Sequence, residues 1–297
     1  MLQRIVNKLR WRAEGIDGRI ALSYARAAAT CAARRIDVNN PITWEFAGFS
    51  QHGEDGIHDF LCANLIRPNR FFFEIGSAGG LENCSTWFAM ARGYGGVMVE
   101  GNPQRAVRCQ RLCARMLNVH AIQLMVTPEN VGNLIKMCPM RDPDLFILDI
   151  DSVDYHIRKK VLELGLRPRI VTVEYNSSLG PERALTIPLR PEFDRFQAHA
   201  SGLYYGASVR AWRKLLEKQG YQFLTVESNG VNAFFADPAA FAPGFLASVH
   251  GLEFLDNFSD MNAATCPRIG ADGVHVMPAR DWRTQFELIK GMEFVEV

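Results

Sequence analysis

Residues 71–80 read Phe71-Phe72-Phe73-Glu74-Ile75-Gly76-Ser77-Ala78-Gly79-Gly80, an apolar run that passes directly into small residues. Such a run predicts a buried strand, and the small residues predict a tight turn into a helix. Small residues at this turn let the backbone approach a ligand closely, and a helix N-terminus offers free N–H groups. The acid two residues before Gly76 would repel a pyrophosphate, but it suits a ligand that carries an ammonium group.

Short apolar runs alternate with helical stretches along the chain, which is typical of parallel strands joined by crossover helices. The predicted strands are Arg70–Ile75, Gly96–Glu100, Val119–Val126, Leu145–Ile150 and Ile170–Glu174, and the predicted helices are Leu81–Arg92, Pro103–Met116, Pro128–Met137, Asp154–Leu164 and Ala207–Gln219. Tyr221–Val226 and Val231–Ala236 flank Asn229-Gly230, which indicates a hairpin. We therefore predict an α/β fold whose doubly wound, mostly parallel seven-stranded sheet ends in an antiparallel hairpin.

The composition is that of an ordinary globular chain. Of 297 residues, 48% are hydrophobic and 22% are charged, which argues against a disordered, collagen-like or coiled-coil protein. The formal net charge of +1 gives no overall attraction to nucleic acid. Because the seven cysteines form no regular framework, and because we find neither a transmembrane stretch nor a secretory signal, we expect a cytoplasmic protein.

The N-terminal arm departs from this even charge balance. Residues 1–35 hold eight Lys or Arg and two acids, and Leu2, Ile5, Val6 and Leu9 recur at helical spacing. The arm either packs on the body as a solvated helix with one docked stripe or makes weak contact with an anionic membrane surface. We divide the chain into a basic helical arm (1–40), an α/β domain (41–238) and an irregular C-terminal extension (239–297) packed on that domain.

A second strand ends in a carboxylate, in Val97-Met98-Val99-Glu100-Gly101-Asn102-Pro103, 24 residues after Gly76. A carboxylate at this strand end is placed to accept hydrogen bonds from both hydroxyls of a ribose. Enzymes that use NAD place an acid there too. Glu100 therefore indicates an adenosine-bearing cofactor without identifying it.

Acids also follow the predicted fourth and fifth strands, as Asp149 and Asp151 and then as Glu174 with Asn176. Residues two apart on an extended chain point the same way, so four oxygen-bearing side chains are expected to converge if the strands are neighbours. Carboxylates this close raise one another's pKa and need compensation. A divalent cation such as Mg²⁺ held by Asp149, Asp151 and Glu174 would supply it, as would a shared proton or a substrate amine. Asp149-Ile150-Asp151 also resembles the DxD motif of metal-dependent glycosyltransferases.

Taken together, these residues resemble the class I S-adenosylmethionine-dependent methyltransferases, and within them the FkbM-type group that methylates hydroxyls. The resemblance covers roughly Ser50 to Ala236 and rests on Ser50-Gln51-His52-Gly53-Glu54-Asp55-Gly56, Phe73–Gly80, Val99–Asn102, Leu148–Tyr155, Val173–Glu182 and Tyr204–Ser208. Ala78 stands where the family has the middle glycine of its acid-x-Gly-x-Gly-x-Gly turn.

The resemblance implies a role for each matching residue. The cofactor-binding residues would be Gln51, Glu74, Gly76, Ser77, Gly79, Glu100, Asn102 and Asp149, with Glu74 and Gly76 at the amino acid part of S-adenosylmethionine, Glu100 at the ribose, Asn102 beside the adenine and Asp149 beneath the sulfonium. Residues 51–55 would close over the cofactor. The acceptor pocket would be lined by Tyr175, Asn176, Tyr205 and Ser208, and the base would be Asp151, Glu174 or His52.

The implied activity is O-methylation of a hydroxyl on a sugar, a glycan or a small natural product. The partner is then a small-molecule or glycan substrate and no nucleic acid, and the sequence leaves the formation of homo-oligomers open. Two alternatives remain: a metal-dependent DxD glycosyltransferase, and a non-catalytic adaptor that keeps the fold and docks through its basic arm.

Overall fold

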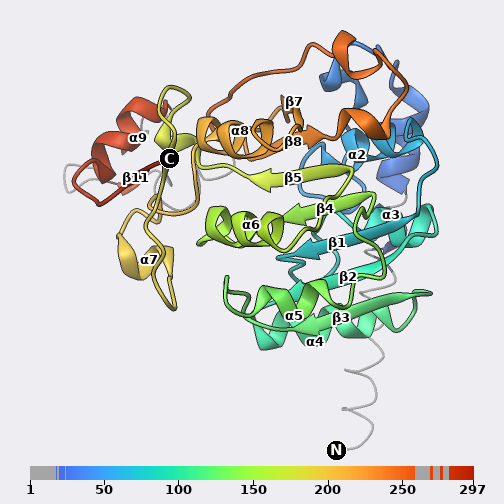
Figure 1. Ribbon diagram of the computed structural model, residues 1–297, viewed down its shortest axis with the longest axis horizontal. Helices are drawn as coiled ribbons and strands as arrows, with labels where there is room; N and C mark the ends of the chain where they lie inside the picture. The colour runs from blue at the N-terminus through green and yellow to red at the C-terminus, as the bar shows by residue number, and fades with distance from the viewer. Residues whose placement is uncertain (1–17, 19, 24, 258–267, 270–274, 277–280) are drawn as a thin grey trace, which may run out of the picture.

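A seven-stranded sheet forms the centre of the computed structural model, which describes residues 18, 20–23, 25–257, 268–269, 275–276 and 281–297 (Figure 1). The strand order is β3-β2-β1-β4-β5-β8-β7. All neighbours are parallel except β8, which runs antiparallel to β5 and to β7. The strands are β1 (Phe71–Ile75), β2 (Gly95–Glu100), β3 (Val119–Gln123), β4 (Leu145–Leu148), β5 (Ile170–Glu174), β7 (Gln222–Val226) and β8 (Asn232–Ala236). The predicted doubly wound, mostly parallel sheet ending in a hairpin is confirmed.

Helices cover both faces of this sheet. Buried residues of α5, α6 and α8 share one core cluster with one set of strand side chains, and those of α2, α3 and α4 share a second cluster with the alternate set. The helices are α2 (Glu54–Ala63), α3 (Thr86–Ala91), α4 (Pro103–Cys113), α5 (Val131–Ile135), α6 (Asp154–Glu163), α7 (Arg195–Ala198), α8 (Val209–Glu217) and α9 (Trp282–Ile289). Short 3-10 turns are η1 (Pro41–Trp44), η2 (Ser177–Leu179), η3 (Pro238–Ala240) and η4 (Leu246–Ser248).

The central strands are apolar runs because they are buried on both sides. Successive side chains of a strand point to opposite faces, so Phe72 packs into one core cluster and Phe73 into the other. The Phe73 ring stacks on Phe146 of the neighbouring strand β4, with 5.9 Å between the ring centroids. Apolar runs of four to six residues therefore suffice to fix these strands.

Element boundaries differ from prediction where side chains compete for the backbone. The predicted helix Leu81–Arg92 begins only at Thr86. Residues 83–85 form a loop instead, because the buried carboxylate of Glu74 accepts hydrogen bonds from the amide side chain of Asn83 and the backbone N–H of Cys84. The third strand ends at Gln123, three residues earlier than predicted.

The C-terminal part contains more regular structure than predicted. Its last strand, β11 (Val295–Glu296), pairs antiparallel with β6 (Leu185–Thr186), and α9 packs against η2. A second short pair joins β9 (Arg268–Ile269) to β10 (His275–Val276). These elements are short and lack periodicity over a full window, which is why composition alone predicts an irregular segment.

The predicted apolar stripe of the N-terminal arm, Leu2 to Leu9, lies outside the described residues. Residues 25–33 are helical, and Ala27 is buried against the domain. Among the helices that the structure describes, none combines the length and the apolar character needed to cross a bilayer.

Candidate functional site

A cleft of ≈ 1280 Å³ opens at the carboxyl ends of the central strands. Its lining includes Gly76 after β1, Glu100 at the end of β2, and the loop 149–153 after β4. The strand order reverses between β1 and β4, so the cleft lies at the topological switch point, where sheets of this kind bind ligands. In Figure 1 the arrowheads of β1, β4 and β5 all point toward the side on which α7 lies.

The turn after β1 is held tightly against the neighbouring strand. Gly76 has φ +98°, and a Cβ added to it would lie 1.6 Å from the carbonyl oxygen of Asp149. The backbone N–H groups of Gly76 and Ser77 both donate to the carbonyl of Val99, at 2.8 and 3.0 Å. Only glycine fits this close approach, and Gly76 lines the cleft. Ala78 also lines the cleft and has φ +48°, the left-handed region that favours glycine.

Glu100 and Asn102 form the next part of the wall. The Glu100 carboxylate accepts a hydrogen bond from the Asn102 N–H at 2.6 Å. The Asn102 side chain caps α4 by accepting from Gln104 N at 2.9 Å and Arg105 N at 3.1 Å. Asn102 therefore has a structural role in addition to its place in the cleft. Beyond Glu100, a mostly apolar run completes this side of the cleft: Leu124, Met125, Val126, Thr127 and Pro128.

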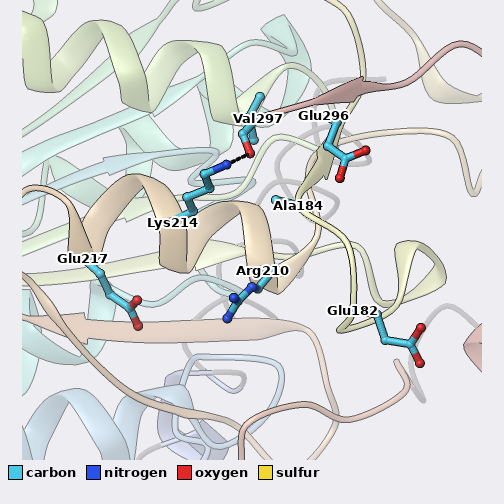
Figure 2. Close-up of a pocket in the computed structure, with 7 residues that line it drawn as sticks. All are labelled: Glu182, Ala184, Arg210, Lys214, Glu217, Glu296 and Val297. Atoms are coloured by element: carbon cyan, nitrogen blue, oxygen red, sulfur yellow. Dashed lines mark hydrogen bonds between the residues drawn. The ribbon is translucent and has the colours of Figure 1, made fainter.

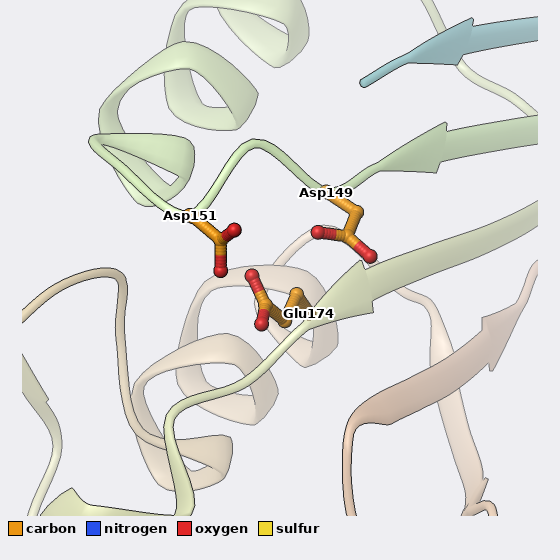
Figure 3. Close-up of side chains that lie close together, drawn as sticks. All are labelled: Asp149, Asp151 and Glu174. Carbon is orange, nitrogen blue, oxygen red and sulfur yellow. The ribbon is translucent and has the colours of Figure 1, made fainter. Parts of the chain in front are cut away.

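Three of the four predicted acids and amides converge. Oxygen atoms of Asp149, Asp151 and Glu174 lie within 4.8 Å of one another. Figure 3 shows the Asp149 and Asp151 carboxylates reaching from the loop after β4 toward Glu174 at the end of β5. The sequence analysis attributed this convergence to an extended chain, but the backbone around Asp151 is not extended. Strand β4 ends at Leu148, and Asp151 has φ +55°.

The cluster compensates its own charge. Burial raises the pKa of Asp149 well above its ordinary value, and the nearby charges of Asp151 and Asp154 raise it further. Carboxylate oxygens of Asp149 and Glu174 lie within 4.8 Å of each other, and two carboxyl groups this close favour the protonated form of one of them. Glu174 also accepts a hydrogen bond from the hydroxyl of Tyr205, at 3.2 Å.

Arg195 is the main site residue that the sequence analysis missed. Its guanidinium donates to Asp151 at 2.6 Å and lies 4.7 Å from the centroid of the Tyr205 ring. It also lines the cleft. The sequence offers only a weak indication, because Arg195 follows Asp151 by 44 residues in a stretch without periodicity.

A divalent cation is therefore not required by this cluster. Its oxygen atoms are of the kind that Mg²⁺ accepts, but Arg195 already pairs with Asp151 at 2.6 Å. A metal ion bound to Asp151 would compete with this ion pair. The sequence analysis named a cation, a shared proton and a substrate amine as sources of compensation; the structure adds an internal arginine to these.

Two buried carboxylates hold the loops that border the cleft. Asp154, at the start of α6, accepts from Ile150 N at 3.0 Å and Ser152 N at 2.9 Å, which fixes the loop around Asp151. Asp55 accepts from three successive backbone N–H groups, those of Gly48, Phe49 and Ser50, at 2.6 to 2.9 Å. Burial raises the pKa of Asp154 to about 6 and that of Asp55 to about 7.

Glu74 lies beneath the turn after β1, where it contacts the protein's own loop. Its carboxylate is buried and accepts hydrogen bonds from Asn83, Cys84 and Ser85, at 2.5 to 2.9 Å. Burial raises its pKa to about 7. Because these donors belong to the loop before α3, Glu74 anchors that loop beneath the turn, and it is absent from the described lining of the cleft.

Three of the predicted acceptor residues also serve the backbone. The Asn176 amide donates to the carbonyls of Leu203 and Tyr205, at 2.7 and 2.9 Å. Ser208 caps α8, and the Tyr175 hydroxyl donates to Leu255 O at 2.7 Å. All three side chains are buried and absent from the described cleft lining. The fourth, Tyr205, is also buried and absent from the described lining, and its hydroxyl contacts Glu174 of the acid cluster.

Of the remaining predicted site residues, some line the cleft and others do not. Gln51 lines the cleft, while His52, Ser77 and Gly79 are not among its described lining residues. The His52 backbone N–H donates to Glu54 at 2.9 Å, and Ser77 is buried with its hydroxyl 3.6 Å from the Cys109 sulfur. The structure brings Asp151 and Glu174 together, whereas the role of His52 as a base stays a prediction.

A second, smaller hollow of ≈ 340 Å³ lies along α8 (Figure 2). It is lined by Glu182, Ala184, Arg210, Lys214, Glu217, Glu296 and Val297. Lys214 donates to the Val297 carbonyl oxygen at 2.6 Å. Its charges are of both signs, and none of its residues belongs to a central strand end, so the larger cleft is the better candidate.

Comparisons with known proteins give only distant structural likenesses. No protein-family model and no curated protein matches the sequence. An O-methyltransferase from Bacillus cereus in complex with SAH is 17% identical, with a TM-score of 0.39 over 73% of this chain and 89% of that one. The O-methyltransferase TomG from Streptomyces achromogenes, in complex with SAM, is 18% identical, with a TM-score of 0.39 over 61% and 77%. A SAM-dependent methyltransferase from Aquifex aeolicus is 10% identical, with a TM-score of 0.36 over 60% and 87%.

Proposed function

We propose that this chain is an S-adenosylmethionine-dependent methyltransferase of the FkbM type, which methylates a hydroxyl on a sugar, a glycan or a small natural product. The observation that supports it best is the cleft at the switch point between β1 and β4, where Gly76 and Glu100 lie in one wall. This combination of a glycine turn and a strand-end acid suits an adenosyl ligand.

The residues of the cleft fit such a donor. Glu100 would accept the ribose hydroxyls, and the run from Leu124 to Pro128 would border the adenine. The backbone at Gly76 would receive the amino acid part, with Gln51 beside it. The volume of ≈ 1280 Å³ exceeds the roughly 300–1,000 Å³ of common ligand pockets, so donor and acceptor can be held together.

Bound S-adenosylmethionine would supply an activated methyl group, which the acceptor oxygen takes by displacing the sulfur. The chain's own contribution is positioning, exclusion of water and removal of the acceptor proton. Glu174 and Asp151 are the groups we propose for the proton. Tyr205 and Arg195 hold them in place through hydrogen bonds of 3.2 and 2.6 Å.

The convergence of Asp149, Asp151 and Glu174 also favours a second candidate function, the metal-dependent glycosyltransferase. In that case the three acids would bind Mn²⁺ or Mg²⁺ together with a nucleotide sugar. The Arg195–Asp151 ion pair makes this the weaker proposal, because a metal ion would compete with it for Asp151.

Calorimetric titration with S-adenosylhomocysteine (SAH) tests the first proposal. We expect binding by the wild type, and an affinity about 10- to 150-fold lower in Glu100→Gln, because a charge-assisted hydrogen bond contributes roughly 1.5–3 kcal/mol. Glutamine keeps an oxygen for the Asn102 N–H. Glu129→Gln removes the same charge from an exposed position on the same cleft, and we expect it to change the affinity less than about threefold.

Three results would count against the proposal. Equal losses of SAH affinity in both variants would mean that the overall charge of the cleft determines the affinity and that Glu100 makes no specific contact with the ribose. Uptake of UDP-sugars only with Mn²⁺ would favour the glycosyltransferase. Uptake of neither ligand would favour the non-catalytic adaptor.

A further inference from the structure

The wall of the cleft opposite the strand ends is one continuous segment, residues 189–197, every one of which lines the cleft. We call it the acceptor wall. It joins the loop after β4 through the Arg195–Asp151 ion pair and a 3.4 Å hydrogen bond from Ser152 to the Phe193 carbonyl. The acceptor wall therefore borders the acid cluster, the position from which an acceptor would approach.

The acceptor wall exposes a large aromatic ring in a defined position. Phe196 is 56% exposed although it lines the cleft. Its ring lies against Gly202, where an added Cβ would be only 2.6 Å from the ring, and Gly202 has φ +70°. The Arg195 guanidinium lies 5.0 Å from the ring centroid. The ring is thus supported by backbone and by a cation, while much of its surface stays open.

The charges of the cleft disfavour an anionic acceptor. Among the described residues, three arginines and seven acidic side chains line it, and one of these acids is Asp149, whose pKa is raised by burial. Two of these arginines are engaged by the protein's own acids, Arg195 by Asp151 and Arg190 by Glu293, at 2.6 and 2.9 Å. A phosphate or carboxylate on the acceptor would meet an excess of negative charge, whereas the sulfonium and ammonium groups of the donor would be attracted to it.

We propose that Phe196 is the stacking platform for the ring of an uncharged acceptor, and that the acidic cleft rejects phosphorylated acceptors. An aromatic face packs against the ring of a sugar or a phenol, and it carries no net charge that would select an anion. This inference rests on the proposed methyl transfer and adds to it the class of acceptor and the residue that recognises it.

A panel of matched acceptors tests this. Transfer of labelled methyl from S-adenosylmethionine is measured with methyl glycosides and simple phenols, and with the phosphorylated form of each. We expect the uncharged compounds to be methylated, with kcat/KM at least about tenfold above that of the phosphorylated partner. Phe196→Ala should raise KM about tenfold, which corresponds to about 1.4 kcal/mol, with a smaller change in kcat. Phe196→Tyr should restore KM.

Leu288→Ala is the matched control, because Leu288 is also 56% exposed but lies on α9 and not among the described residues of the cleft. Preference for phosphorylated acceptors, an unchanged KM in Phe196→Ala, or methylation of no uncharged ring compound by a protein that binds SAH would each overturn the inference. A wild type that binds no SAH would instead overturn the proposed function.

Discussion

Replacing Gly76 by alanine should separate β1 from the loop after β4. The new Cβ would lie 1.6 Å from the Asp149 carbonyl oxygen, whereas real Cβ contacts are almost never below 3.0 Å. The required shift would break the hydrogen bonds from Asp149 N to Ile75 O and from Gly76 N to Val99 O, at 3.0 and 2.8 Å. A side chain at positive φ costs roughly 1–2 kcal/mol. Two lost hydrogen bonds cost roughly 0.5–1.5 kcal/mol each, so we expect a loss of about 2–5 kcal/mol.

Gly93→Ala provides the matched control, because Gly93 has φ +66° but no atom within 4 Å of an added Cβ. Its free energy of unfolding should fall only by the cost of a side chain at positive φ, about 1–2 kcal/mol. Urea unfolding of both variants gives the free energies of unfolding, and calorimetry with SAH gives the affinities. We expect Gly76→Ala to be the less stable variant and the only one with weakened SAH binding. Equal stabilities and equal affinities would refute the close approach at Asp149 as the reason for glycine.

Two further predictions concern parts of the domain outside the cleft wall. Ser208→Ala should lower the free energy of unfolding by about 1–3 kcal/mol and leave SAH affinity unchanged, because the hydroxyl caps α8 and accepts from Leu185 N at 3.1 Å; an unchanged stability in urea would contradict this. The urea midpoint should fall as the pH rises from 5 to 7.5. Burial raises the pKa of Asp55 and of Glu74 to about 7, so the native state holds more protons than the unfolded state in this range. The free energy of unfolding then falls by up to about 1.4 kcal/mol per proton and pH unit. Asp55→Asn should flatten this slope, and a midpoint that rises with pH would show the reasoning to be wrong.

The succession of strands and helices along the chain, and the sheet edge at which the cleft lies, follow from patterns that are local in sequence. Each central strand is a continuous apolar run, because it is buried on both faces, and each run ends where a glycine or an acid begins. Glu100 was predicted at a strand end and lies there, next to a helix whose start is marked by Asn102-Pro103. These features need no knowledge of distant contacts.

The hydrogen-bond partners of polar side chains could not be predicted from the sequence. Residue types that are common in binding sites occur at Glu74, Asn176 and Ser208. Each of these side chains forms hydrogen bonds with the backbone or with a neighbouring loop. A carboxylate or hydroxyl beside a strand end looks the same in sequence whether its partner is a ligand or a peptide group. The partner is supplied by the folded chain.

The sequence by itself determined the alternation of strands and helices, and with it the strand-end acids and the glycine turn, because these depend on burial and backbone conformation within a few residues. Only the tertiary structure decided which of those acids meet, that Arg195 pairs with Asp151, and that Phe196 remains open beside them. Such pairings join segments tens of residues apart, so they depend on how loops without periodicity cross the sheet edge, and local propensity contains no information about that path.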